Sequence, residues 1–596
     1  MRNHGRPTDR RRTPTNLLSL ELRGSMPEFL SGITLPPVPE HLSLEEFILS
    51  EPTDGRYRPF RPGSAPWLIS DTTGQNLHLD EIREKTAGLA NGLHLQFGIE
   101  EDDVVLIISS NHIYYPLCIW ALHRLRAIVS PCNPSSTVSE LIHQLSQTHP
   151  SLIIAHKTVL NVALSSAREV DISEERIVIL DDEEQYHRGF MTVANLTERG
   201  LRNPFDWMGR KMGPGEGRKK VAFFCASSGT TGKPKIVAIS HFSAIANVVQ
   251  IATLNRVNEA YTSSDTRRYR PGDRCLAVLP FYHIYGLVVA IHFVLFSGMT
   301  VVVVPKFNFE GMLKSIVRHK INQLMLVPPQ VALLCKEPVV KNYDLSAVRA
   351  VLCAGAPLSS ELNQQLIDLL PNAHIGQAYG QTESTGVVSM WPTRTKHGFN
   401  GGELAPGVRA RIVKSDGTLA GYNEPGELLL KTPAAALGYF GNEEATNEAF
   451  VDGWLRTGDQ VMINEENEVI YIDRLKEIMK VRGFQVSPAE LEGCMLGHEL
   501  VADVCVVGIP SDYSGEVPLA FVVPTAAAAA MMQQDPEAIF KAKKLIMEYV
   551  AKLKSPYKHI RRIEFVNEIP KNPSGKLLRR ILRERAKGLA ISSAKL

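Results

Sequence analysis

A chain of 596 residues is too long for one small module and, at roughly 150 residues per domain, corresponds to about four domain-sized units. Hydrophobic residues make up 44% and charged residues 21%, which excludes global disorder and supplies enough apolar side chains for packed cores. Because 65 Lys and Arg residues balance 63 Asp and Glu residues, the net charge is only +2, and binding to nucleic acid or an anionic membrane would need a local patch.

The N-terminal segment 1–40 is basic and polar and lacks the continuous apolar core of a secretory signal. Its arginines also occur in mitochondrial presequences, but Asp9 and two early prolines favour a disordered extension. Single cysteines in apolar stretches, without paired or metal-ligand spacing, indicate a reducing compartment; they are Cys118, Cys225, Cys275, Cys335, Cys353 and Cys505.

From Val104 onward, short apolar strands alternate with amphipathic helices, which predicts an α/β fold with parallel-rich sheets covered by helices. The expected strands lie at 104–110, 151–156, 221–227, 274–280, 300–305, 321–329 and 347–355. After Ala410, shorter strands with Asp-Gly and Pro-Gly turns predict a small β-rich unit. After Asp473, strands mixed with helices at 488–496 and 536–554 predict a small α+β domain, and the alanine run 525–530 is a loop or a frayed helix start.

The segment 284–304 carries no formal charge over a length that would span a bilayer. However, Ser297 and Gly298 divide a helix-like half from a β-branched half, and Pro305 ends the second half. This pattern favours a buried helix followed by a buried parallel strand over a membrane span.

A glycine-rich and hydroxyl-rich turn with two lysines follows the apolar strand 221–226 and leads to a helix that begins near Ser240. Backbone N–H groups, hydroxyls and ammonium groups in such a turn can converge on phosphate oxygens, although an ordinary flexible turn has the same composition. The spacing is not that of a Walker A loop. The candidate phosphate-binding residues are Ser227, Ser228, Gly229, Thr230, Thr231, Gly232, Lys233 and Lys235.

Nine consecutive positions, 227–235, resemble the signature loop of the adenylate-forming (AMP-binding) enzyme superfamily, which contains acyl-CoA synthetases, luciferases and peptide-synthetase adenylation domains. The resemblance continues in order from about Leu44 to Arg583 and is to acyl-CoA synthetases and coumarate:CoA ligases. It implies a domain at 41–472 that binds ATP and forms an adenylate, followed by a small mobile domain at 473–590 and a tail at 591–596.

The resemblance also implies roles for residues around the acid substrate. The motif 279–287 is similar to the family's substrate gate, with His283 near the reacting carboxylate and Tyr285 in the acyl pocket. Val288 and Val289, together with Val387 and Val388, fall where relatives line that pocket, so we expect a largely apolar carboxylic acid. Lys306 falls where coumarate:CoA ligases place a lysine that contacts CoA.

Two turns, 353–359 and 376–384, resemble the pair that encloses adenine and holds the α-phosphate. Tyr379 would stack on the base, Thr382 would contact phosphate, and Glu383 would hold magnesium, which prefers carboxylate and phosphate oxygens. Ala378 stands where many relatives carry glycine. The remaining nucleotide-binding candidates of these turns are Gly355, Ala356, Gln377 and Gly380.

Asp459, in the motif 453–459, would accept both ribose hydroxyls, and Arg474 would reinforce the ribose contact. The resemblance makes Lys576, in the motif 570–580, the catalytic adenylation lysine. Asp473 would be the pivot of the mobile domain, so that Asp473→Pro should spare pyrophosphate release and impair thioester formation. The CoA channel would be formed by Lys476, Lys480, Arg482 and Gly483, where Arg482 replaces a lysine of coumarate:CoA ligases.

These motifs imply an acyl-CoA ligase that uses ATP, magnesium and coenzyme A. One alternative is an adenylation enzyme that loads a carrier protein, although no carrier domain follows and the gate motif lacks the aspartate that anchors an amino group. A luciferase-like oxygenase is a second alternative, and a non-catalytic nucleotide- or acyl-binding protein, which would be expected to lack Lys576 or Glu383, is a third. The final residues Ala594-Lys595-Leu596 resemble the tripeptide read by the peroxisomal import receptor, so we expect a peroxisomal protein, and otherwise a cytoplasmic one.

Overall fold

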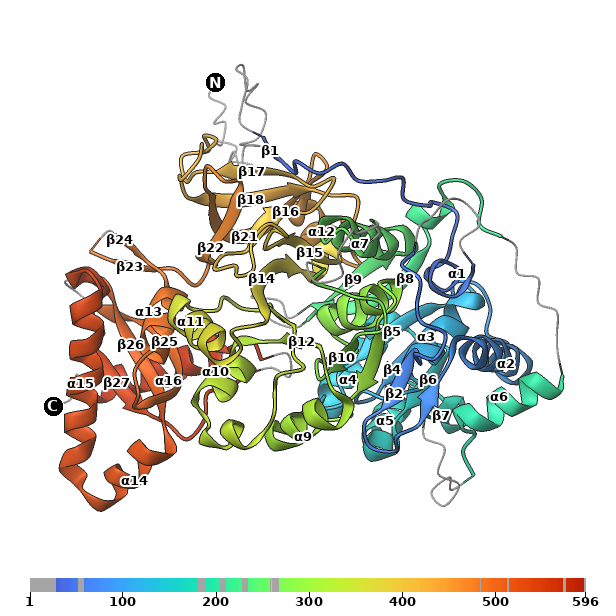
Figure 1. The fold of residues 1–596 in the computed structure, drawn as a ribbon, viewed down its shortest axis with the longest axis horizontal. Helices are drawn as coiled ribbons and strands as arrows, with labels where there is room; N and C mark the ends of the chain where they lie inside the picture. The colour runs from blue at the N-terminus through green and yellow to red at the C-terminus, as the bar shows by residue number, and fades with distance from the viewer. Residues whose placement is uncertain are drawn as a thin grey trace, which may run out of the picture.

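The computed structural model describes residues 28–51, 58–180, 189–203, 211–227, 234–257, 259, 267–482, 484–511, 514–571 and 575–593 (Figure 1). Some predicted features therefore lie outside the described residues: most of the N-terminal extension, the loop residues 228–233, Gly483 and the C-terminal tripeptide. Within the described ranges the strands form three sheets.

The first sheet joins a parallel half to an antiparallel, β-rich half (Figure 1). The parallel half contains β2 (Leu68–Ser70), β10 (Arg274–Ala277), β11 (Thr300–Val303), β12 (Gln323–Leu326), β13 (Ala350–Cys353) and the start of β14 (His374–Gln381), with β3 (Asn76–Leu77) at its edge. The β-rich half contains β1 (Phe29–Leu30), β15 (Gly386–Met390), β16 (Gly402–Leu404), β17 (Arg409–Val413), β18 (Gly426–Lys431), β20 (Phe450–Val451), β21 (Trp454–Ile463) and β22 (Glu468–Arg474).

The second sheet is parallel at its centre and carries two antiparallel strands next to the candidate phosphate loop. Its strands are β4 (Val104–Ile108), β5 (Ile128–Cys132), β6 (Leu152–Ala155), β7 (Ile177–Ile179), β8 (Val221–Ser227), β9 (Lys235–Ser240) and β19 (Gly438–Tyr439). The predicted helix start near Ser240 is confirmed by α7 (His241–Leu254), but the sequence analysis did not predict β9, which pairs with β8 between the loop and this helix. Ser240 is the N-cap of α7, because the Ser243 N–H donates to the Ser240 hydroxyl.

The third sheet forms the core of the C-terminal α+β part. Its strands are β23 (Met479–Val481), β24 (Phe484–Val486), β25 (Val501–Ser511), β26 (Gly515–Pro524) and β27 (Arg562–Phe565). Residues of β25 alternate between two apolar clusters, with Val504 and Val506 under α13 (Pro488–Leu496) and α15 (Pro536–Leu553), and Cys505 and Val507 under α16 (Arg579–Ser593).

Helices cover both faces of the parallel sheets, so their strands are apolar on both sides. In β11, for example, Val301 packs into the cluster that contains the segment after Tyr285, whereas Val302 packs under α9 and α10. The helices are α1 (Leu44–Leu49), α2 (Leu79–Phe97), α3 (Tyr115–Arg124), α4 (Val138–Thr148), α5 (Leu160–Arg168), α6 (Val193–Arg202), α7 (His241–Leu254), α8 (Val294–Phe296), α9 (Phe309–His319), α10 (Pro328–Lys336), α11 (Ser360–Leu369), α12 (Glu443–Ala449), α13 (Pro488–Leu496), α14 (Ala526–Gln534), α15 (Pro536–Leu553) and α16 (Arg579–Ser593).

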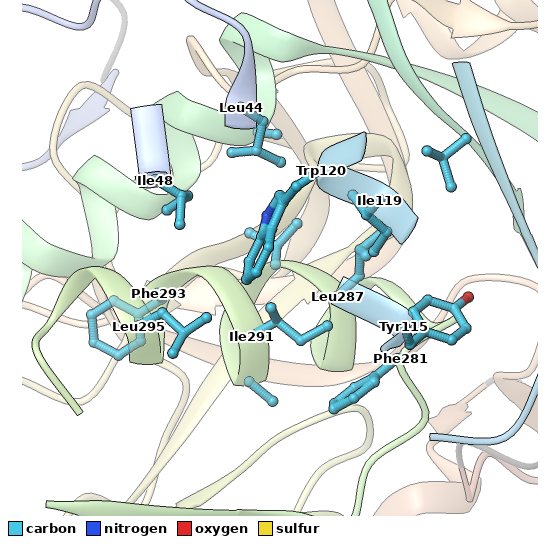
Figure 2. Close-up of a cluster of buried hydrophobic side chains, with 14 of the residues drawn as sticks. Leu44, Ile48, Tyr115, Ile119, Trp120, Phe281, Leu287, Ile291, Phe293 and Leu295 are labelled. Carbon is cyan, nitrogen blue, oxygen red and sulfur yellow. The ribbon is translucent and has the colours of Figure 1, made fainter. Parts of the chain in front are cut away.

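The uncharged segment 284–304 is buried inside the N-terminal part, as the sequence predicted. It forms a π-helix over Tyr285–Phe293, then α8, then β11. Figure 2 shows Leu287, Ile291 and Phe293 facing side chains of α1 and α3. At the centre of this cluster the Trp120 indole N–H donates to Nε2 of His292 at 3.2 Å. None of the helices in the described part of the chain combines the length and the apolar character needed to cross a bilayer.

Candidate active site

The end of β8 brings Ser227, the first residue of the candidate phosphate loop, to Glu383. The Ser227 hydroxyl donates to Glu383 Oε1 at 3.0 Å, and the Tyr439 hydroxyl donates to the same oxygen at 2.9 Å. Lys235 lies on the other side of Tyr439, with its Nζ 4.7 Å from the ring centroid. Glu383 is therefore anchored next to the loop by two neutral donors, and the sequence analysis did not identify Tyr439 as one of them.

A second group of side chains surrounds Asp459. The register of β21 and β22 pairs Asp459 with Arg474, and the Arg474 Nε lies 2.7 Å from Asp459 Oδ1. The Tyr379 hydroxyl donates to Asp459 Oδ2 at 2.7 Å. Burial raises the pKa of Asp459, while Arg474 and the hydrogen bond from Tyr379 oppose that rise. The Tyr379 hydroxyl thus occupies Oδ2, whereas Oδ1 faces Arg474 but accepts no hydrogen bond from the described residues, which leaves it open to a ribose hydroxyl.

Lys576 completes this group from the C-terminal part of the chain. Burial and the nearby Arg474 cation together lower the pKa of Lys576 to about 8, although Asp459 and Glu383 act in the opposite direction. Burial also lowers the pKa of His283 to about 4, and the Lys576 cation adds to that effect. These mutual influences bring the three predicted catalytic residues, Lys576, His283 and Glu383, into one electrostatic cluster.

The turn before Lys576 packs directly on the N-terminal part. Gly575 has a φ of +82°, in the left-handed region that favours glycine. A Cβ atom at Gly575 would lie 3.1 Å from the side chain of Val327, at the start of α10. The close approach of this turn explains how Lys576 reaches a site built mainly by residues before 475.

Predicted acyl-pocket residues are buried close to this cluster. The Tyr285 hydroxyl donates to the Leu352 carbonyl at 3.0 Å, so it is engaged by β13. Val289 is 1% exposed. The side chain of Asn247, on α7, accepts from the Val387 N–H at 3.1 Å and donates to the Val387 carbonyl at 2.8 Å. Asn247 therefore holds the start of β15 in place, a role that sequence analysis missed because the two residues are far apart in the chain.

The two turns predicted to enclose adenine meet through Gln377. Its Oε1 accepts from the Leu358 N–H at 3.0 Å, and its Nε2 donates to the Phe399 carbonyl at 2.9 Å. Gln377 therefore joins the two turns. Gly380 admits no side chain, since a Cβ atom there would lie 1.8 Å from the Gly386 carbonyl oxygen, whereas Ala378 is accommodated in β14, where it pairs with Met390.

Further candidates lie around these turns. Gly355 has a φ of +87°, and Ala356 follows it in the first turn. Thr382 begins the short 3₁₀ turn that also contains Glu383.

The predicted CoA residues are on the surface in this arrangement of the chain. Lys306 follows β11 and is exposed, and Lys476 and Lys480 are exposed around β23. Arg482 has a φ of +52° at the turn between β23 and β24, and its N–H donates to the Ser514 carbonyl at 2.8 Å. All four residues are exposed, so the structure brings together the adenylation candidates and leaves the CoA candidates on the surface.

Asp473, the predicted pivot, caps a helix of the C-terminal part. It is 1% exposed, and its Oδ2 accepts from the Ser487 hydroxyl at 2.7 Å and from the Ala489 N–H at 3.0 Å. Its Oδ1 accepts from the Arg474 N–H at 2.8 Å. Because Ser487 is the N-cap of α13, Asp473 connects the last strand of the first sheet to the first helix of the C-terminal part.

Comparison with known proteins agrees with this architecture. The family described as "AMP-binding enzyme" matches residues 60–440, and "AMP-binding enzyme C-terminal domain" matches residues 490–576. The chain is 35% identical to the "Peroxisomal OPC-8:0-CoA ligase 1" of Arabidopsis thaliana, over 95% of this chain and 96% of that protein. It is 33% identical to the "4-coumarate--CoA ligase 3" of Arabidopsis thaliana, over 92% of each chain.

Solved structures show the same fold. The anthranilate CoA ligase AuaEII in complex with anthranoyl-AMP matches with a TM-score of 0.78 and 21% identity, covering 93% of this chain and 99% of that chain. A benzoate CoA ligase from Burkholderia xenovorans LB400 matches with a TM-score of 0.72 and 19% identity, covering 91% and 100%. On the family match over most of its length and the identity to CoA ligases over nearly all of it, the chain belongs to the AMP-binding enzyme family.

Proposed function

We propose that this AMP-binding enzyme is an ATP-dependent CoA ligase, which converts a largely apolar carboxylic acid to an acyl-adenylate and then to a CoA thioester. The observation that carries the proposal is the buried cluster in which Lys576 of the C-terminal part joins Arg474, Asp459 and Glu383. The relatives named as CoA ligases along nearly the whole chain support the same reaction.

The first step brings two anions together, so the protein must mainly position them and neutralise charge. A carboxylate oxygen of the substrate attacks the α-phosphorus of ATP, the bond from that phosphorus to the bridging oxygen breaks, and pyrophosphate leaves. With a pKa of about 8, Lys576 is mostly protonated at pH 7 and supplies a cation at this point. His283, with a pKa of about 4, is neutral at the same pH and lines the acid without adding charge.

The second step needs a thiol at the carbonyl carbon of the adenylate. The sulfur bonds to that carbon, the thiol proton is lost, and AMP leaves. We propose that the C-terminal part turns about Asp473 between the steps, which withdraws Lys576 and brings the exposed hairpin at Arg482 to the site. The exposed positions of Lys480 and Arg482, together with the position of Lys576 near Asp459, support this order.

The residues present fit a magnesium ion. No group of three or more His, Cys, Asp or Glu side chains in the described part of the chain could hold a metal by itself. Magnesium commonly uses one or two carboxylates together with substrate phosphates, and Glu383 provides one such carboxylate beside the phosphate loop. Bound there, the ion would neutralise phosphate charge, while Ser227 and Tyr439 orient the Glu383 carboxylate.

The acid is expected to be apolar because its candidate pocket offers few free polar groups. Val289 and Val387 are buried, and the Tyr285 hydroxyl is already bonded to the Leu352 carbonyl. A pocket lined by these apolar side chains disfavours acids with polar substituents, whose groups would lose their hydrogen bonds to water.

The experiment is ATP-dependent pyrophosphate release with a panel of carboxylic acids, with and without CoA. We expect release that depends on the acid, a thioester product with CoA, and a loss of at least a hundredfold in Lys576→Ala, since removing one donor from a preorganised charge-stabilising site costs about 10²–10³ in rate. Lys552→Ala, which removes an exposed lysine of α15, is the matched control. Release without thioester would indicate another acceptor, such as a carrier protein, and no release with any acid would contradict the proposal.

We further propose that the protein acts in the peroxisome. A relative named as a peroxisomal CoA ligase supports this location, as does the sequence Ala594-Lys595-Leu596. A fluorescent protein fused ahead of Met1 should co-localise with a peroxisomal marker, and removal of residues 594–596 should leave it in the cytoplasm. An unchanged distribution after removal would contradict the role of the tripeptide.

A further inference from the structure

A half-buried cation, Lys336, crosses the contact between the N-terminal and C-terminal parts of the chain. Lys336 is the last residue of α10, which packs under the first sheet. Its Nζ donates to the carbonyl oxygen of Leu496 at 2.6 Å and to that of Val501 at 2.6 Å. Leu496 ends α13 and Val501 begins β25, so both acceptors belong to the C-terminal part.

The chemistry of these acceptors makes the contact specific. The last carbonyls of a helix lack partners within the helix and carry the negative end of its dipole, which favours a cation there. Burial lowers the pKa of Lys336 to about 8, while Cys335 and Asp503 raise it, so the amine is mostly protonated at pH 7. Hydrogen bonds from an ammonium group are about twice as strong as those between neutral groups.

The helix that carries Lys336 also receives the turn that carries Lys576. At the start of α10, Gly575 approaches Val327 and Pro329, with distances of 3.1 Å and 3.8 Å from a Cβ atom built on the glycine. The nine residues of α10 span about 13 Å at 1.5 Å per residue. Thus the C-terminal part rests on both ends of a single helix, with the adenylation lysine at one end and Lys336 at the other.

The surroundings of Lys336 are apolar and close-packed. Leu496 packs against the apolar cluster under α9–α11 as well as against that of the C-terminal part. Gly493, on α13, faces Ser359 so closely that a Cβ atom at Gly493 would lie 2.9 Å from the Ser359 Cβ. A turn of the C-terminal part about Asp473 would have to break these contacts, including the charged hydrogen bonds of Lys336.

We propose that Lys336 is a positioning residue that holds the C-terminal part in the adenylation arrangement by binding the Leu496 and Val501 carbonyls, and that its bonds break when this part turns for thioester formation. The inference rests on the proposed two-step reaction. In this proposal α10 covers the sheet and also controls the arrangement of the C-terminal part. The strength of the hydrogen bonds of Lys336, its last residue, sets the fraction of enzyme molecules in which Lys576 faces ATP.

The test separates the two half-reactions in Lys336→Met, which keeps an unbranched stem of similar length but loses the charge. Acid-dependent exchange of labelled pyrophosphate into ATP measures the first half, and thioester formation from CoA and a synthetic acyl-adenylate measures the second. We expect the first rate to fall about tenfold, because fewer molecules would hold Lys576 at the site, and the second to stay the same or rise. Lys341→Met, at an exposed position shortly after α10, should change neither rate.

If Lys336 only stabilised the fold, Lys336→Met would lower the rates of both half-reactions by the same factor. An unchanged ratio of the two rates would therefore overturn the inference. If the variant is too unstable to assay, the double substitution Ser359→Cys with Gly493→Cys provides a second measurement. A disulfide there holds the same interface covalently, so it should restore exchange in Lys336→Met when oxidised and lose that effect when reduced. Absence of rescue in fully cross-linked protein would also overturn the inference. A wild-type enzyme inactive in both half-reactions would instead contradict the proposed function.

Discussion

The same cysteine pair, placed in the otherwise unchanged enzyme, tests whether the two steps need different arrangements of the chain. Ser359 precedes α11 and Gly493 lies in α13. A disulfide between these two positions, in the double variant Ser359→Cys with Gly493→Cys, would link the C-terminal part covalently to the first sheet. A Cβ atom at Gly493 lies 2.9 Å from that of Ser359, whereas disulfides average about 3.8 Å between Cβ atoms. The interface therefore needs to open by about 1 Å, a small shift compared with rotation of a domain.

We expect cross-linked enzyme to release one pyrophosphate per active site and then to stop, because the adenylate stays bound and the hairpin at Arg482 cannot reach the site. If about 95% of the molecules are cross-linked, thioester formation should fall about twentyfold, to the share of the free molecules, and should recover with a reductant. The assay is a rapid-quench burst of pyrophosphate together with chromatography of the CoA thioester. Each single cysteine variant is a control, since the native cysteines are buried or partly buried.

Thioester formation at the reduced enzyme's rate, in protein shown by mass to be fully cross-linked, would refute the reasoning. Both half-reactions would then take place in one arrangement, and the exposed positions of Lys480 and Arg482 would have to be explained differently. Loss of the pyrophosphate burst itself would show that a 1 Å opening already removes Lys576 from the site, and would also contradict the expectation.

Three further outcomes follow from the site. For pH dependence, kcat/KM for ATP should fall as pH rises through about 8, because Lys576 loses its proton there and the neutral amine no longer balances phosphate charge. In Lys576→Arg, this decrease should shift to higher pH. A decrease at the same pH in the variant would contradict the assignment. At the pivot, Asp473→Pro should impair thioester formation more than pyrophosphate release. Asp473→Ala loses the same bonds to Ser487 and Ala489 but leaves φ free, so it should lower the rates of both half-reactions equally. In the ribose site, Asp459→Asn should raise KM for ATP at least tenfold, since it removes the charge that Arg474 faces, and an unchanged KM would remove Asp459 from that site.

Elements whose signals are local could be predicted well from the sequence. The strands that build the parallel sheets are short apolar runs buried on both faces, so the same pattern marks them wherever they lie. The segment 284–304 is instructive, because Ser297 and Gly298 indicated the break between the helix and β11 that the structure contains. In contrast, β9 was not anticipated after the phosphate loop, since its pairing with β8 depends on a partner beyond the turn.

Contacts between distant residues could not be predicted in this way. Tyr439 reaches Glu383 because β19 pairs with β9, and Asn247 holds Val387 across 140 residues of sequence. Neither contact leaves a periodic or spacing signal in the chain, because side-chain hydrogen bonds of this kind depend on where the elements pack.

By itself, the sequence determined most of the strands and helices of the parallel sheets, their apolar faces and the motifs that resemble the AMP-binding enzymes, since each of these depends on neighbouring residues. Only the tertiary structure decided whether the turn with Lys576 or the hairpin at Arg482 faces the site. Lys576 lies half-buried beside Asp459, the hairpin at Arg482 is exposed, and Lys336 donates to the Leu496 carbonyl, 160 residues away in the chain. The physical reason is that the position of the C-terminal part depends on a few charged and close-packed contacts between separate parts of the chain. These contacts form only once both parts have folded.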